Sequence, residues 1–142
     1  MERHVLPSRL ESCPLERYVT SFPTADRAAR LLIADAASPW SFFVWSARDL
    51  LRATLWALHL TRAEDWTLAD VLAIVSDPEK HKALLNSAPE VKDEVECYFD
   101  TSDRRTLAVI REVLASSLAS HSPHLRIRDA PRPRDRRHRS PS

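Results

Sequence analysis

The sequence predicts an all-α fold, a compact bundle of about six helices followed by a disordered tail. Glycine is absent from all 142 residues, whereas about 7% is usual. A fold of several strands needs glycine at hairpin turns and bulges. Helix-capping residues and prolines recur at short intervals, and apolar residues follow them at helical spacing. The length suits one domain that buries a core without metal ions or disulfide bonds.

Charge and composition divide the chain into an N-terminal arm at 1–23, a helical domain at 24–120 and a tail at 121–142. Residues 1–120 carry 14 Lys and Arg against 18 Asp and Glu, a net charge of −4. The tail carries 7 against 2, a net charge of +5, and is rich in Arg, Pro and Ser. Such a segment buries too little apolar surface to offset chain entropy, so we expect disorder there.

Capping residues and prolines set the expected start of each helix. Ser, Thr and Asp satisfy free N–H groups at a helix N-terminus, and proline is favoured at the first helical position. Thr67 with Asp70 three residues later is also a capping-box pattern. In chain order, the expected helices are 25–35 capped by Thr24, 39–61 after Ser38 and Pro39, 68–75 after Thr67, 78–87 after Asp77, 89–99 from Pro89, and 103–120 capped by Thr101 or Ser102.

The long expected helix carries two aromatic or apolar faces. One face is wide enough to form the centre of the core; its residues are Trp40, Phe43, Val44, Ala47, Leu51, Thr54, Leu55 and Leu58. On the opposite side Trp45 and Trp56 align three turns apart, with Arg52 at cation–π spacing from Trp56. This second ridge either packs under a neighbouring helix, which we favour, or forms a surface for another domain or subunit.

Catalytic and metal-binding patterns each lack an essential part. A Walker A loop and a G-x-S-x-G elbow both require glycine. His121 and His124 are the one histidine pair at ligand-like spacing, with no carboxylate or cysteine cluster near them. Cys13 and Cys97 stand alone, as expected for reduced thiols in a cytoplasmic protein. We therefore expect no enzymatic activity, no cofactor and no metal ion. The most apolar stretch, 40–60, carries four ionisable residues, so we expect no membrane insertion.

Basic residues in the helical domain are the candidates for contact with nucleic acid. Lys80, Lys82, Arg104 and Arg105 lie at expected helix starts. Acidic residues outnumber basic ones in this domain, which argues against an extensive phosphate-binding surface. The acidic side of the fifth helix, with Glu94 among its residues, is interpreted as a solvated face. The tail arginines either bind nucleic acid nonspecifically or have no role, and we favour the second reading.

Four segments together resemble the all-α domain of TraG/TraD-type coupling proteins of type IV secretion and conjugation. Each segment is short, but their order and spacing agree over about two-thirds of the chain. They are Asp26-Arg27-Ala28-Ala29-Arg30-Leu31-Leu32-Ile33, Phe43-Val44-Trp45-Ser46-Ala47-Arg48-Asp49-Leu50-Leu51, Thr67-Leu68-Ala69-Asp70-Val71, and Asp103-Arg104-Arg105-Thr106-Leu107-Ala108-Val109-Ile110.

The resemblance implies a helical substrate-recognition module at the cytoplasmic side of a membrane-anchored, hexameric ATPase. The implied partners are single-stranded DNA, its relaxase complex and a separate motor. Lys80, Lys82, Arg104 and Arg105 are the expected substrate contacts, and Trp45, Arg52 and Trp56 the expected protein interface. The motor's Walker A loop and transmembrane segment have no counterpart here, so we expect a module alone, from a truncated or split gene. An unrelated helical adaptor that binds another protein remains the alternative.

Overall fold

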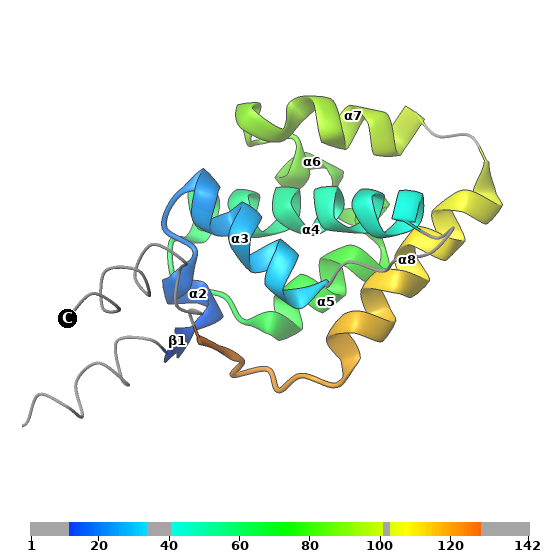
Figure 1. The fold of residues 1–142 in the computed structure, drawn as a ribbon. Helices are drawn as coiled ribbons and strands as arrows, with labels where there is room; N and C mark the ends of the chain where they lie inside the picture. The colour runs from blue at the N-terminus through cyan, green and yellow to red at the C-terminus, as the bar shows by residue number, and fades with distance from the viewer. Residues whose placement is uncertain (1–11, 34–40, 101–102, 129–142) are drawn as a thin grey trace, which may run out of the picture.

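The computed structural model describes residues 12–33, 41–100 and 103–128 and confirms the all-α fold (Figure 1). Two short 3-10 turns, η1 (Pro78–His81) and η2 (Pro89–Val91), and two three-residue strands, β1 (Ser12–Pro14) and β2 (Arg126–Arg128), complete it. The described α-helices are α2 (Leu15–Tyr18), α3 (Phe22–Leu32), α4 (Ser41–Arg62), α5 (Leu68–Ser76), α6 (Lys82–Leu85), α7 (Lys92–Asp100) and α8 (Arg104–Ala119).

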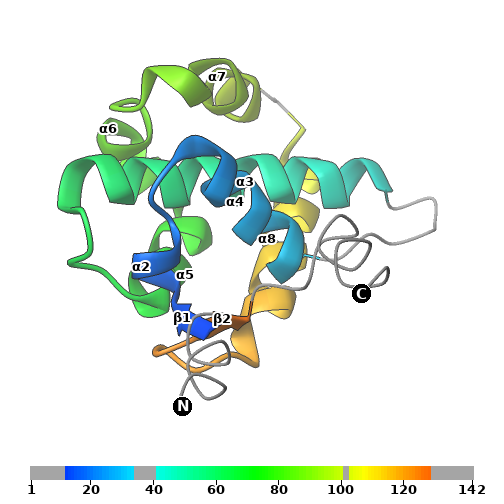
Figure 2. The same cartoon turned by 60° about the vertical axis from the view of Figure 1, so that its left-hand side comes forward.

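Helix α4 lies in the middle of the fold, with α6 and α7 on one side and α5 and α8 on the other (Figure 2). Helix α3 packs along it as well. The predicted apolar face is buried from Val44 to Leu58, and Thr54 donates a hydrogen bond to the Leu50 carbonyl oxygen at 2.8 Å. Trp40 lies outside the described residues. No described helix has the combination of length and apolarity that crossing a bilayer requires.

The folded unit extends beyond the predicted boundaries at residues 24 and 121. Strands β1 and β2 pair antiparallel, with Cys13 opposite Ile127. Leu15 and Val19 from the expected arm are fully buried, and Ile127 from the expected tail is 5% exposed. The Leu15 amide also donates to the Leu125 carbonyl at 2.9 Å. These apolar residues were too isolated in sequence to indicate a core contribution, and they gain it by pairing with each other.

Two helix starts differ from the sequence prediction. Ser21, not Thr24, caps α3; Thr24 occupies the third helical position and completes a reciprocal capping box with Ser21. Asp103 caps α8 through a 3.0 Å hydrogen bond from the Arg105 amide. Thr101 and Ser102, the expected caps, lie outside the described residues, as do Ser38 and Pro39. The predicted capping box of α5 is confirmed, since the Thr67 amide donates to Asp70 at 2.9 Å.

The helices expected at Pro78 and Pro89 begin as 3-10 turns. Pro78 opens η1, which leads into α6, and α6 ends at Leu85, before the expected Ser87. Pro89 opens η2, which leads into α7. Tighter 3-10 turns are common at helix ends, where the missing proline N–H is no loss.

A left-handed residue ends α4 in a chain that has no glycine for this position. Ala63 has φ 54°, and its amide donates to the His59 carbonyl at 2.9 Å. This conformation costs a residue with a Cβ roughly 1–2 kcal/mol. Ala63→Gly is therefore expected to raise the free energy of unfolding by about 1 kcal/mol, measured in urea. Ala115→Gly, in the exposed interior of α8, is the matched control and should lower it by about 1 kcal/mol. A loss of stability in both variants would contradict the argument.

Candidate functional site

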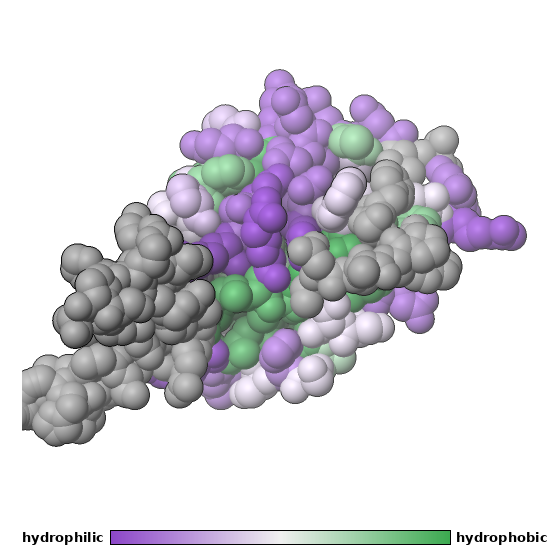
Figure 3. Space-filling view, in the orientation of Figure 1, coloured by the Kyte–Doolittle hydropathy of each residue, from purple (hydrophilic) through white to green (hydrophobic). Residues whose placement is uncertain are grey.

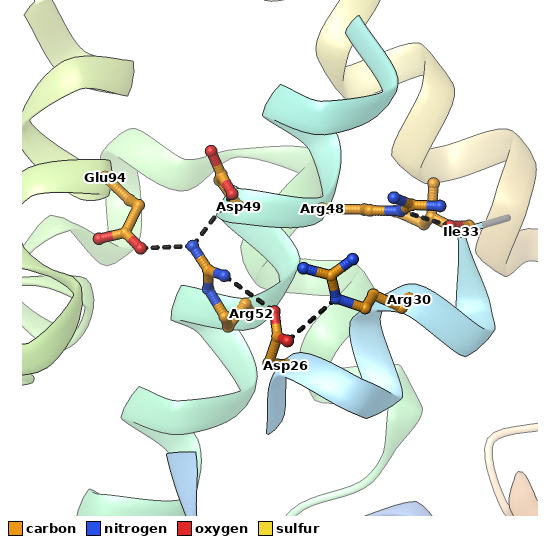
Figure 4. A network of polar contacts seen from close by, with 7 residues as sticks. All are labelled: Asp26, Arg30, Ile33, Arg48, Asp49, Arg52 and Glu94. Carbon is orange, nitrogen blue, oxygen red and sulfur yellow. Dashed lines mark hydrogen bonds and ion pairs between the residues drawn. The ribbon is translucent and has the colours of Figure 1, made fainter. Parts of the chain in front are cut away.

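Arg52 joins three helices through its guanidinium group (Figure 4). Its Nη1 donates to Oδ1 of Asp26 on α3 at 2.8 Å. Its Nη2 donates to Oδ1 of Asp49 on α4 at 3.0 Å and also to Oε2 of Glu94 on α7. Arg30 adds a second cation, with Nε 3.0 Å from Oδ2 of Asp26. The outer helices α3 and α7 are thereby tied to the central helix by polar contacts as well as by apolar packing.

Partial burial makes these contacts stronger than ordinary surface ion pairs. The side chain of Arg52 is 17% exposed, and those of Glu94 and Asp26 are 22% and 29% exposed. Burial alone raises the pKa of the Asp26 carboxyl, but hydrogen bonds from Arg30 and Arg52 outweigh burial and lower it. Burial raises the pKa of Asp49; the Arg52 charge opposes this rise, and the charges of Glu94 and Asp26 add to it. Arg52 therefore lowers the pKa of both carboxyls, but only at Asp26 do the favourable contacts outweigh burial.

Asparagine at positions 26 and 49 is expected to change stability in opposite directions at neutral pH. The lowered pKa of Asp26 means that its charge favours folding; this contribution is present above the unfolded pKa of about 3.9 and is lost as the pH falls through the folded value. The raised pKa of Asp49 means that its charge opposes folding. Asp26→Asn should lower the urea midpoint and Asp49→Asn should raise it, and both differences should shrink in acid. A fall in both variants would refute the assignment.

A cleft of about 550 Å³ opens over this network between α3 and α4. Figure 3 shows hydrophilic side chains gathered over α3, α4 and α7 on this face. Trp45 stands at the cleft with 59% of its surface exposed, and Arg48 donates from Nε to the Ile33 carbonyl oxygen at 2.7 Å. Charged groups paired with each other beside an exposed indole suit binding better than chemistry. The cleft is lined by Asp26, Arg30, Trp45, Arg48, Asp49 and Arg52.

The predicted ridge of Trp45, Arg52 and Trp56 is divided by the tertiary structure. Trp56 is 9% exposed, packs edge-on to Phe22, and donates from Nε1 to Oε1 of Glu90 at 2.8 Å. The expected cation–π partner also changes, because Arg52 lies 5.4 Å from the ring centre of Phe22. The ridge was expected to pack under a neighbouring helix, and Trp56 is buried in this way. Trp45 is exposed, as an interface residue must be.

The predicted nucleic-acid contacts do not line this cleft and lie on three elements, η1, α6 and α8. Lys80 on η1 is exposed, and its Nζ lies 3.8 Å from Oδ2 of Asp77. The Nζ of Lys82 on α6 lies 4.8 Å from the centre of the Phe99 ring. Arg104 and Arg105 are exposed in the first turn of α8. None of the four lines the Arg52 cleft. Their role in substrate contact stays a prediction.

Several residues of the network were missed by sequence reasoning. Asp26 and Arg30 were placed on one helix without the ion pairs that they form, and Glu94 was placed on a solvated face, which the Arg52 contact corrects. Asp26 and Glu94 lie 26 and 42 residues from Arg52 in sequence, so helical spacing carries no signal for these two contacts. Within the described part of the chain, no group of three or more His, Cys, Asp or Glu is arranged to hold a metal ion.

Comparison with models of protein families, with curated proteins and with solved structures gives no significant match. The resemblance to coupling-protein all-α domains therefore depends on the four sequence segments alone. The cleft, the Arg52 network and the exposed Trp45 are features of this chain by itself.

Proposed function

We propose that this chain is a helical substrate-recognition module, similar to the all-α domain of conjugative coupling proteins, that binds its partner through Trp45 and the Arg52 cleft. The partner is a DNA–relaxase complex or a subunit of a separate ATPase motor, and the chain itself performs no catalysis. The observation that carries the proposal is the exposure of Trp45, 59%, beside a cleft lined by paired charges. Tryptophan and arginine dominate binding energy at protein interfaces.

The position of Trp45 within the resemblance adds support. Trp45 lies in the segment from Phe43 to Leu51, and Arg48 and Asp49 of that segment also line the cleft. The same nine residues thus carry the likeness and the best candidate surface. These residues lie on α4, the helix that packs against α3, α5, α6, α7 and α8, and such packing reduces the entropy lost on binding.

Trp45→Ala is expected to weaken partner binding by at least tenfold, because a hot-spot tryptophan contributes about 2 kcal/mol or more. The measurement is calorimetric titration against the relaxase–DNA complex and the coupling-protein motor from the same genome. Leu60→Ala is the matched control, since Leu60 is 46% exposed near the other end of α4. Unchanged affinity in Trp45→Ala, or equal loss in both variants, would rule out this surface.

Direct DNA contact is a separate element of the proposal and has its own test. A mobility shift with single-stranded DNA at low salt, reduced when Lys80, Lys82, Arg104 and Arg105 are changed to alanine, would support it. The absence of any shift at low salt would refute direct DNA contact by this chain.

The unrelated helical adaptor is the second candidate, and the exposed Trp45 is equally compatible with it. The two readings differ in the identity of the partner. Binding to a relaxase complex or motor favours the coupling-protein reading, as does a neighbouring gene with Walker motifs. Failure of both, with Trp45-dependent binding to another protein, favours the adaptor.

A further inference from the structure

A second hollow lies on α4 beside the Arg52 cleft and shares Asp49 with it. Its volume is about 90 Å³, and it is formed between α4, α7 and α8. The floor is apolar, because Leu50, Tyr98 and Ile110 are all at most 9% exposed. Cys97 connects it to a shallow hollow along the outer face of α7. We call these two hollows together the α4–α7 groove.

The α4–α7 groove has a rim of carboxylates. Among the described residues, those that line its two hollows include no Lys or Arg. Arg52 contacts two of the carboxylates, and Lys92 lies 3.9 Å from Oε2 of a third, so the groove keeps an excess of negative charge. The five acidic lining residues are Asp49, Asp93, Glu94, Glu96 and Asp100. An apolar floor with an acidic rim fits arginine, whose stem covers apolar surface while its guanidinium binds carboxylates.

The chain itself contains a segment of matching chemistry outside the described residues. Residues 129–142 hold five arginines against Asp129 and Asp135. We propose that this segment binds back onto the α4–α7 groove, with Arg136, Arg137 and Arg139 on its carboxylates. This intramolecular contact goes beyond the proposed function and does not depend on it.

Chain length ranks the five arginines by how far each can lie from β2, and Arg136, Arg137 and Arg139 have the longest reach. An extended chain spans at most about 3.3–3.6 Å per residue, so positions 136–139 reach roughly 26–40 Å from Arg128 at the end of β2. Strand β2 and helix α7 lie on opposite sides of α4 (Figure 2), so the arginines farthest along the tail are the ones best able to come near the groove. Arg132 and Arg134 reach at most about 22 Å from Arg128, so we use them as the control pair.

The test compares two tail variants of the full chain by amide NMR at low salt. Arg136, Arg137 and Arg139 changed to serine should shift the amide signals of Glu94, Cys97 and Tyr98. Arg132 and Arg134 changed to serine form the matched control and should leave them unchanged. The indole signal of the buried Trp66 reports that the fold is intact in both variants. High salt should move the signals of the unaltered chain to their positions in the first variant, since screening shortens the range of these contacts.

A second variant tests the same contact by changing the groove instead of the tail. Asp93→Asn, Glu96→Gln and Asp100→Asn together should shift the amide signals of residues 136–139 toward their high-salt positions. The proposal is overturned if the groove signals do not change in the first tail variant, or if both tail variants shift them equally. It is also overturned if the groove substitutions leave the tail signals unchanged. Shifts that grow with protein concentration would also overturn it, because they assign the contact to a second copy.

Discussion

Arg52→Met is expected to lower the free energy of unfolding by about 3 kcal/mol. The substitution keeps most of the apolar stem but leaves the carboxylates of Asp26, Asp49 and Glu94 without the cation that they share. Breaking a buried ion pair by removing one partner costs about 3–5 kcal/mol. We expect the lower end because the Asp49 side chain is 49% exposed and water relieves part of the repulsion. Urea unfolding at neutral pH and low salt measures the effect.

The pH dependence of Arg52→Met separates repulsion among carboxylates from a simple loss of packing. Without Arg52 the three carboxylates are better tolerated when protonated, so the deficit should shrink as the pH falls. A packing defect would be independent of pH. Arg30→Met is the control: Arg30 is 61% exposed and has one ion pair, to Asp26, among the described residues, so its loss should cost less than about 1 kcal/mol. Equal effects at positions 30 and 52 would contradict the central role of Arg52.

Trp56→Ala is expected to be the most damaging single change at the predicted ridge, at about 3–5 kcal/mol. It removes a buried indole and its edge-on contact with Phe22. It also removes the stacking of this indole on the His59 ring, whose centre lies 5.4 Å away. It also removes the donor that holds Glu90. The measurement is again the free energy of unfolding in urea, with the slope checked for two-state behaviour.

Trp45→Ala is the matched comparison for Trp56→Ala, since both change a tryptophan of the same helix. Trp45 is 59% exposed, so its removal should change stability by no more than about 0.5 kcal/mol. This small effect is also what makes Trp45→Ala suitable for the binding test. A loss at position 45 as large as that at position 56 would mean that Trp45 packs against the fold.

Local sequence patterns predicted where the helices lie better than they predicted which elements pack against each other. The capping box at Thr67 and Asp70 and the apolar face of α4 are confirmed, because local spacing decides both a cap contact and which residues share a face of one helix. The start of α3 was misplaced because Ser21 and Thr24 cap reciprocally, and spacing alone does not say which of them is outside the helix. Leu15 and Ile127 were missed because each becomes buried only when distant ends of the chain pair.

The missing glycine shows where the sequence was sufficient. It argued against a multi-stranded fold and ruled out a phosphate-binding loop, since both conclusions concern what a backbone with a Cβ at every residue can adopt. Its local cost appears at Ala63, which takes the left-handed position that glycine usually fills.

The sequence by itself determined that the chain is helical and which residues share a face of each helix, because a period of 3.6 residues is a local property. Only the tertiary structure decided the fates of Trp45 and Trp56. They lie on one side of α4, but Phe22 and Glu90 cover Trp56 and leave Trp45 exposed. The same holds for Arg52, whose carboxylates come from α3 and α7 as well as from its own helix. Burial and charge pairing depend on which elements meet, and that is set by packing across the whole fold.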